Sequence, residues 1–300
     1  MIWKKKKKDS PAQAPPDELS PEPTAEGELV EAVGPADPAG LQGGTHPADP
    51  AELQGGTHSG AAAGRIEAAA AERDVPSGEP LLQVSGVQRS FPASGGPIHV
   101  LKGITMEVPH RRLVMLKGRS GSGKTTLLNL IGGLDTPSSG EIWFDGEPIH
   151  KLGDDKRTVI RRERMGFIFQ AFALMPLLSA YENVELSLRM AGTPRSEWKG
   201  RVEHCLAMVG LERRMKHRPF EMSGGEQQRV AIAKAIAHRP RLLLADEPTA
   251  ELDTQMSAQI MSVFRTMIQS EGVTICMTTH DPTILEVADH VYEMVDGTFI

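Results

Sequence analysis

The stretch GRSGSGKTT, residues 118–126, has the residue types and spacing to bind phosphate groups. It fits the pattern G-x-x-x-x-G-K-[ST], in which glycines let backbone N–H groups turn toward a phosphate. Lys124 would reach the terminal phosphates, and the Thr125 hydroxyl would hold Mg²⁺. A plain glycine-rich turn is the alternative, but an apolar strand precedes the stretch and an amphipathic helix follows it. The predicted contact residues are Gly118, Arg119, Ser120, Gly121, Ser122, Gly123, Lys124, Thr125 and Thr126.

Two carboxylates end a second apolar stretch, LLLADE, residues 242–247. Ligands bind beyond the carboxyl ends of buried parallel strands, so Asp246 would anchor Mg²⁺ and Glu247 would activate a water molecule. Such acids alone are more often solvated turn residues, and the phosphate-binding loop upstream favours the catalytic role. A third apolar strand ends at His280, either as a polar cap or as a sensor of the terminal phosphate. Lys124, Glu247 and His280 are the predicted catalytic residues.

The segment MSGGEQQR, residues 222–229, would begin a helix that can bind a second anion. Ser223, Gly224 and Gly225 stand where free N–H groups and the helix dipole attract negative charge. Ser223 as an ordinary N-cap is also expected, but it does not explain two successive glycines. A chain with room for one nucleotide therefore has two helix starts that can bind phosphate.

Together these motifs resemble the nucleotide-binding subunit of ATP-binding cassette (ABC) transporters, over about residues 81–300 and in the family's order. The resemblance implies ATP and Mg²⁺ as cofactors, and a second copy of the chain arranged head to tail. The segment MSGGEQQR, with Glu226, would be the family's signature, which closes over the nucleotide of the partner copy. Gln170 would contact Mg²⁺, and Asp253 would belong to the loop AELD at the nucleotide. Phe91, 27 residues before the phosphate-binding loop, resembles the aromatic residue that stacks on adenine, with an ordinary core residue as the alternative.

The finer resemblance is to the lipoprotein-release and macrolide-export subfamily, through stretches such as HVLKGITMEV and TTHDPTILEVADHVYEMVDG. It implies a separate permease with four membrane spans and a large extracellular domain, and export or extraction of a substrate. The chain would then be cytoplasmic, on the inner face of the cell membrane. PHRR at 109–112, AELD and Met222 depart from the family pattern but keep the catalytic groups. The alternative is a soluble ABC ATPase acting on DNA or the ribosome, although the sequence lacks the long coiled coil or second cassette of such proteins.

The first quarter of the chain differs from the rest in composition. Residues 9–76 carry 13 acids against two arginines and have few large apolar groups, so they bury too little surface to offset chain entropy. We expect a disordered tail over residues 1–78, with a 12-residue tandem repeat at 35–58. Five lysines after Trp3 would lie at an anionic membrane surface or remain solvated.

After the tail, the rest of the chain carries 26 acidic and 26 basic residues, so its formal net charge is zero. This balance argues against nucleic acid as a partner. For residues 81–300 the expected fold class is α/β, a P-loop ATPase with a mainly parallel sheet around the phosphate-loop helix. An antiparallel β part is expected near 81–112 and 141–149, and a helical lobe at about 171–238. Gln170 should lie where the lobes join.

Overall fold

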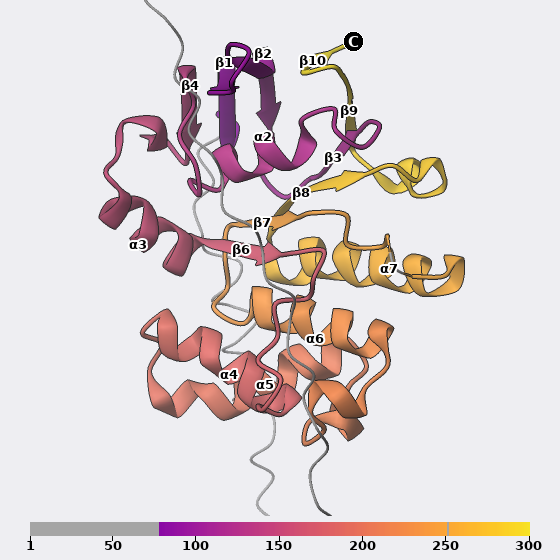
Figure 1. Ribbon diagram of the computed structural model, residues 1–300. Helices are drawn as coiled ribbons and strands as arrows, with labels where there is room; N and C mark the ends of the chain where they lie inside the picture. The colour runs from indigo at the N-terminus through magenta and orange to yellow at the C-terminus, as the bar shows by residue number, and fades with distance from the viewer. Residues whose placement is uncertain (1–77, 251) are drawn as a thin grey trace, which may run out of the picture. The chain divides into compact units, whose positions relative to one another are not determined.

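A computed structural model describes residues 78–250 and 252–300 of the chain (Figure 1). The predicted disordered tail, its tandem repeat and its lysine run lie outside the described residues, apart from Gly78, and stay predictions. None of the helices in the described ranges is long and apolar enough to cross a membrane.

A six-stranded sheet forms the centre of the described part of the chain, with the strand order β10-β9-β3-β8-β7-β6. Its pairs are parallel except for β9 and β10, which are antiparallel. The central strands are short apolar runs, and every residue of β7 and β8 is buried, as expected for strands covered on both faces. The bounds are β3 Leu113–Lys117, β6 Met165–Ile168, β7 Leu242–Ala245, β8 Thr274–Thr279, β9 His290–Val295 and β10 Thr298–Phe299.

Helices α2 (Lys124–Ile131) and α7 (Thr254–Glu271) cover opposite faces of this sheet (Figure 1). The alternation along β3 explains the arrangement, because successive side chains of a strand point to opposite faces. Val114 and Leu116 belong to the apolar cluster that contains the α2 residues. Their neighbours on β3 join the cluster that contains the α7 residues. The phosphate-loop helix is therefore held against a fixed layer of buried side chains.

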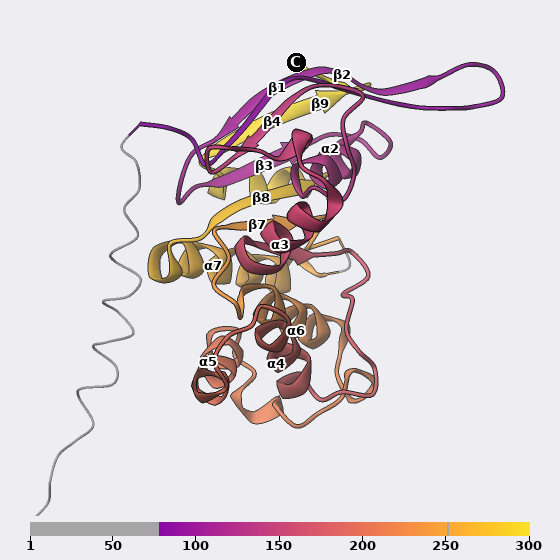
Figure 2. The same cartoon turned by 90° about the vertical axis from the view of Figure 1, so that its left-hand side faces the viewer.

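A four-stranded antiparallel sheet lies over α2, with the strand order β2-β1-β4-β5. Its buried residues share one cluster with α2, which fixes this sheet to the phosphate-loop helix. Figure 2 shows the β1–β2 hairpin reaching beyond the rest of this sheet. The bounds are β1 Leu82–Phe91, β2 Ile98–Val108, β4 Ser139–Phe144 and β5 Glu147–Pro148. The antiparallel part thus forms where the sequence predicted it.

Three helices, α4, α5 and α6, form a lobe on the far side of α7 from the antiparallel sheet (Figure 1). Both α4 and α6 begin with a capping box, in which a serine and a glutamate three residues later exchange hydrogen bonds. One apolar cluster runs from the sheet through α6 to α4 and α5. The bounds are α3 Asp154–Arg164, α4 Ala180–Met190, α5 Arg195–Met208 and α6 Gly224–Ile236. The short 3₁₀ turns are Ile149–Lys151, Glu212–Arg214, Pro219–Glu221 and Pro282–Val287.

Candidate functional site

The loop between β3 and α2 can be made only with glycine at its two ends. A Cβ atom on Gly118 would collide with the Met294 carbonyl oxygen and lie 2.8 Å from the Ser122 hydroxyl. Gly123 has φ 110°, and a Cβ there would lie 2.9 Å from a methyl group of Leu101. The backbone therefore wraps tightly at the start of α2, where unpaired N–H groups are available to an anion.

Lys124 is the first residue of α2 and is 5 % exposed. Its Nζ donates to the carbonyl oxygens of Gly118 (2.9 Å) and Arg119 (3.1 Å). The Glu247 Oε1 atom lies 3.6 Å from the same Nζ. The loop thus holds the ammonium group in one place, where it can attract phosphate oxygens.

Asp246 and Glu247 follow β7, at the edge of the sheet where α2 begins. Two hydroxyl groups donate to the Asp246 Oδ1 atom, from Thr278 at 2.6 Å and from Thr125 at 3.2 Å. The Thr278 hydroxyl also accepts the backbone N–H of Glu247 (2.8 Å), which has φ 47°. Sequence reasoning missed Thr278, which joins both acids. A signal was available, because a hydroxyl in a fully buried strand needs partners.

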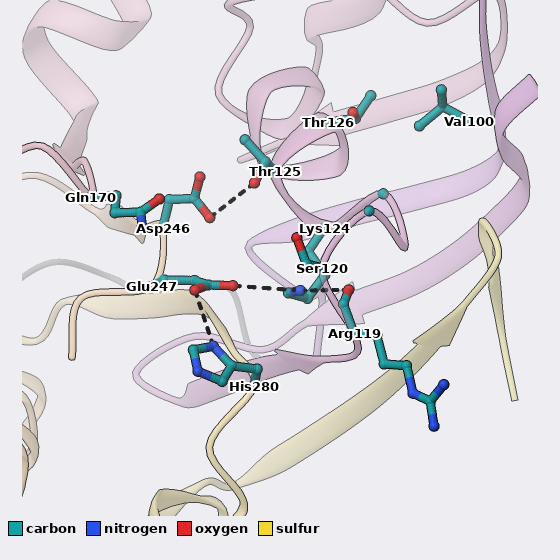
Figure 3. A pocket seen from close by; sticks show the side chains of 12 residues that line it. Val100, Arg119, Ser120, Lys124, Thr125, Thr126, Gln170, Asp246, Glu247 and His280 are labelled. Carbon is teal, nitrogen blue, oxygen red and sulfur yellow. Dashed lines mark hydrogen bonds and ion pairs between the residues drawn. The ribbon is translucent and has the colours of Figure 1, made fainter. Parts of the chain in front are cut away.

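The Glu247 carboxylate lies between a lysine and a histidine (Figure 3). The Nδ1 atom of His280 is 3.1 Å from Glu247 Oε2, and the His280 side chain is 58 % exposed. Figure 3 shows both side chains at the opening that Lys124 and Thr125 also face. The structure therefore places His280 beside the Glu247 carboxylate, and its role as a sensor of the terminal phosphate stays a prediction.

A cavity of about 720 Å³ contains most of the predicted site. It unites residues that are more than 150 positions apart in the sequence, from β2 to the end of β8 (Figure 3). Val100 is the one lining residue that the sequence analysis did not name. Gly118 and Ser122 belong to the loop but are not among the lining residues. The lining residues are Val100, Arg119, Ser120, Gly121, Gly123, Lys124, Thr125, Thr126, Gln170, Asp246, Glu247 and His280.

Phe91 lies at the end of β1 and is 36 % exposed. It belongs to neither apolar cluster of the described residues, so the alternative of an ordinary core residue is wrong. It is also not among the residues that line the cavity. Its role as the platform for adenine stays a prediction.

The signature residues do not line this cavity. Ser223 caps α6, because its hydroxyl accepts the Glu226 N–H (3.3 Å) and its own N–H donates to the Glu226 carboxylate (2.8 Å). The Ser223 N–H is the main reason that the pKa of Glu226 lies below its usual value. A Cβ on Gly224 would meet no atom within 4 Å. Asp253 caps α7 by accepting the Met256 N–H, and it too lies outside the cavity lining.

A glycine loop that opens a helix, with a lysine, a threonine and two acids at one sheet edge, defines a P-loop nucleotide-hydrolysing domain. Residues 101–250 match the family described as ABC transporter. The chain belongs to this family, and it is an ATPase cassette of the family that binds nucleotide. The predicted fold class is therefore confirmed.

Named relatives agree with this assignment. The chain is 43 % identical over 222 residues to the macrolide export ATP-binding/permease protein MacB of Agrobacterium fabrum, covering 74 % of this chain and 34 % of the relative. It is 41 % identical to the uncharacterized ABC transporter ATP-binding protein YknY of Bacillus subtilis, covering 73 % and 95 %. It is 38 % identical to the lipoprotein-releasing system ATP-binding protein LolD of Hyphomonas neptunium, covering 74 % and 97 %. The chain thus spans about a third of MacB but nearly all of the other two.

A solved structure shows the same fold. It is a dimeric ATP-binding cassette in a post-hydrolysis state bound to ADP and Pi, with a TM-score of 0.68 and 38 % identity. The match covers 73 % of this chain and 96 % of that cassette. These relatives are transporter components, so the alternative of an ATPase acting on DNA or the ribosome is wrong.

Proposed function

We propose that this chain hydrolyses ATP at the cavity between α2 and the ends of β7 and β8, and that this reaction drives a separate membrane permease. The observation that carries the proposal is that five side chains from three distant segments meet there. They are Lys124, Thr125, Asp246, Glu247 and His280. A lysine, hydroxyl and carboxylate oxygens and a candidate base at a glycine loop are the groups that phosphoryl transfer to water requires.

The donor set fits Mg²⁺. Thr125 Oγ1 and Asp246 Oδ1 lie 3.2 Å apart beside the phosphate-binding loop, and Mg²⁺ prefers such oxygen ligands. We assign Thr125, Asp246 and Gln170 as the groups that hold it. Magnesium would supply neutralisation of the charge on the phosphate oxygens.

The chain's own residues have distinct roles in this proposal. Lys124 attracts and orients the terminal phosphates from within the loop. Glu247 accepts a proton from the attacking water, and the hydrogen bond from its backbone N–H to Thr278 fixes its place beside the loop. His280 orients that carboxylate through Oε2, whereas Lys124 faces Oε1. His280 would also contact the terminal phosphate.

A second copy of the chain would complete the site through its signature. Gly224 has open space around it in this chain, so packing within the subunit does not require a glycine there. The approach of a phosphate held by the loop of a partner copy would require it, because glycine gives the closest backbone access. Ser223, Gly224, Gly225 and Glu226 would then bind the partner's nucleotide, and Asp253 would lie at the same interface. The dimeric state of the similar cassette supports this arrangement.

The transport partner is proposed as a permease with four membrane spans and a large extracellular domain. The names of the export and lipoprotein-releasing relatives support export or extraction of a substrate. The chain would then lie in the cytoplasm on the inner face of the cell membrane. Co-expression with such a permease should give a complex whose ATPase rate differs from that of the isolated chain. If the two proteins purify apart and the rate does not respond, the transport part of the proposal is wrong.

Two substitutions test the catalytic part. Lys124→Ala should abolish tight ATP binding, because it removes the positive charge from the loop. Glu247→Gln should keep ATP binding but lose turnover, so an ATP-bound dimer should accumulate on size exclusion. Glu163→Gln, an exposed glutamate on α3, is the matched control and should behave as the wild type. A Glu247→Gln chain with the wild-type rate would refute the role of Glu247 as the base.

A further inference from the structure

The exposed ring of Phe91 is covered on one face by an arginine. The Arg89 guanidinium carbon lies 4.4 Å from the centroid of the Phe91 ring, two residues along the same strand. A cation over an aromatic face is attracted by the negative charge of that face. Phe91 lies outside both apolar clusters of the described residues, and the contact with Arg89 limits how its ring can turn.

Arg89 is itself held by a carboxylate. Its Nε donates to Asp135 Oδ2 (2.8 Å) and its Nη2 donates to Asp135 Oδ1 (2.9 Å). Both side chains are less than a third exposed, at 22 % and 30 %. Such a two-point bond fixes the plane of the guanidinium, and its flat face remains free to stack.

Asp135 is fastened to the phosphate-loop helix. The backbone N–H groups of Leu134 and Asp135 both donate to the Asn129 carbonyl oxygen in α2, at 2.9 and 3.3 Å. The Asp135 carboxylate also accepts the N–H of Thr136 (2.7 Å), which limits its movement. A continuous set of contacts therefore joins α2, which begins at the phosphate-binding loop, to the ring of Phe91.

We propose that Arg89 is a positioning residue for the base of the nucleotide. Arg89 covers one face of the Phe91 ring and leaves the other face open to a planar nucleobase. Through Asp135 it also fixes the position of that ring relative to the phosphate-binding helix. This inference rests on the proposed function, ATP hydrolysis, and on the prediction that Phe91 stacks on adenine. It assigns to the Arg89–Asp135 pair a part in nucleotide affinity and none in the chemical step.

The test compares KM and kcat for ATP hydrolysis by the full chain and its variants. Arg89→Ala should raise KM about two- to fivefold, the range of an exposed cation–π contact, with kcat unchanged. The inhibition constant of inorganic tripolyphosphate, a competitive inhibitor, should stay at the wild-type value, because this ligand has no base. Asp135→Asn, which keeps the side-chain shape, should shift KM in the same direction. Lys102→Ala, which removes an exposed cation from the neighbouring strand β2, should leave KM unchanged.

A double-variant cycle separates this inference from the proposed function. In a Phe91→Ala background, Arg89→Ala should have no further effect on KM, because the ring that it orients is gone. Wild-type KM in Phe91→Ala would refute the adenine platform itself. A raised KM in Phe91→Ala together with wild-type KM in both Arg89→Ala and Asp135→Asn would overturn only the role of Arg89. Weaker tripolyphosphate inhibition by the same factor as KM would also overturn it, since Arg89 would then act on the phosphate site.

Discussion

The hydroxyl of Thr278 contacts both acids of the site, so its removal should damage stability and turnover together. It lies in a fully buried position of β8, donates to Asp246 and accepts the Glu247 N–H. Thr278→Val keeps the shape of the side chain but removes both hydrogen bonds. A hydrogen bond to a charged group contributes about 1.5–3 kcal/mol and a neutral one about 0.5–1.5 kcal/mol, so the free energy of unfolding should fall by roughly 2–4.5 kcal/mol.

This loss can be measured as a change in melting temperature and rate. For a domain of about 220 residues each kcal/mol shifts Tm by about 2–4 °C, so Thr278→Val should melt roughly 4–18 °C below the wild type. The kcat should fall at least about tenfold, because a positioned general base contributes about 10²–10⁴ and Glu247 loses its anchor. Thr278→Ser keeps the hydroxyl and is the control. If the valine variant matches the serine variant in both Tm and kcat, the bridge has no role in holding the acids.

Three other experiments address the dimer, the acid stability and the tail. A dimer of one Lys124→Ala chain and one Gly224→Asp chain should keep ATPase activity. A dimer of one wild-type chain and one chain that carries both substitutions should be inactive. The opposite pair of results would show that each signature acts on the phosphate-binding loop of its own chain. For Glu271, burial raises the pKa but hydrogen bonds from Arg201 and a histidine outweigh it, holding the pKa at about 2 against the usual 4.5. A lowered folded-state pKa stabilises the fold above about pH 4.5 and loses that effect as pH falls toward 2, so urea midpoints should drop more in the wild type than in Glu271→Gln. Deleting residues 1–76 should leave the ATPase rate nearly unchanged, and a large loss would place part of the site outside the described residues; binding of the full chain to anionic vesicles that fades with salt would support a membrane role for the lysine run.

Most residues that meet in the cavity could be named from the sequence by itself. The phosphate-binding loop is local, since its glycines and Lys124 act within nine consecutive residues. Asp246, Glu247 and His280 could be placed at the same edge because the carboxyl ends of parallel strands meet there. That placement required only that the short apolar runs before these residues be recognised as buried strands. The signature could likewise be predicted as a helix start, and the structure confirms that Ser223 caps α6.

Contacts between distant segments were decided only by the tertiary structure. Thr278 bridges Asp246 and Glu247 because β7 and β8 pair in one particular register, which strands buried on both faces do not specify by an alternating pattern. Arg89 meets Asp135 because β1 pairs with β4, which follows Asp135, and because the antiparallel sheet packs onto α2. Both contacts join segments that are distant in the sequence and that only the folded chain brings together. The sequence sets which faces are apolar, but the packing of all side chains in a layer fixes the register and the distance between polar groups.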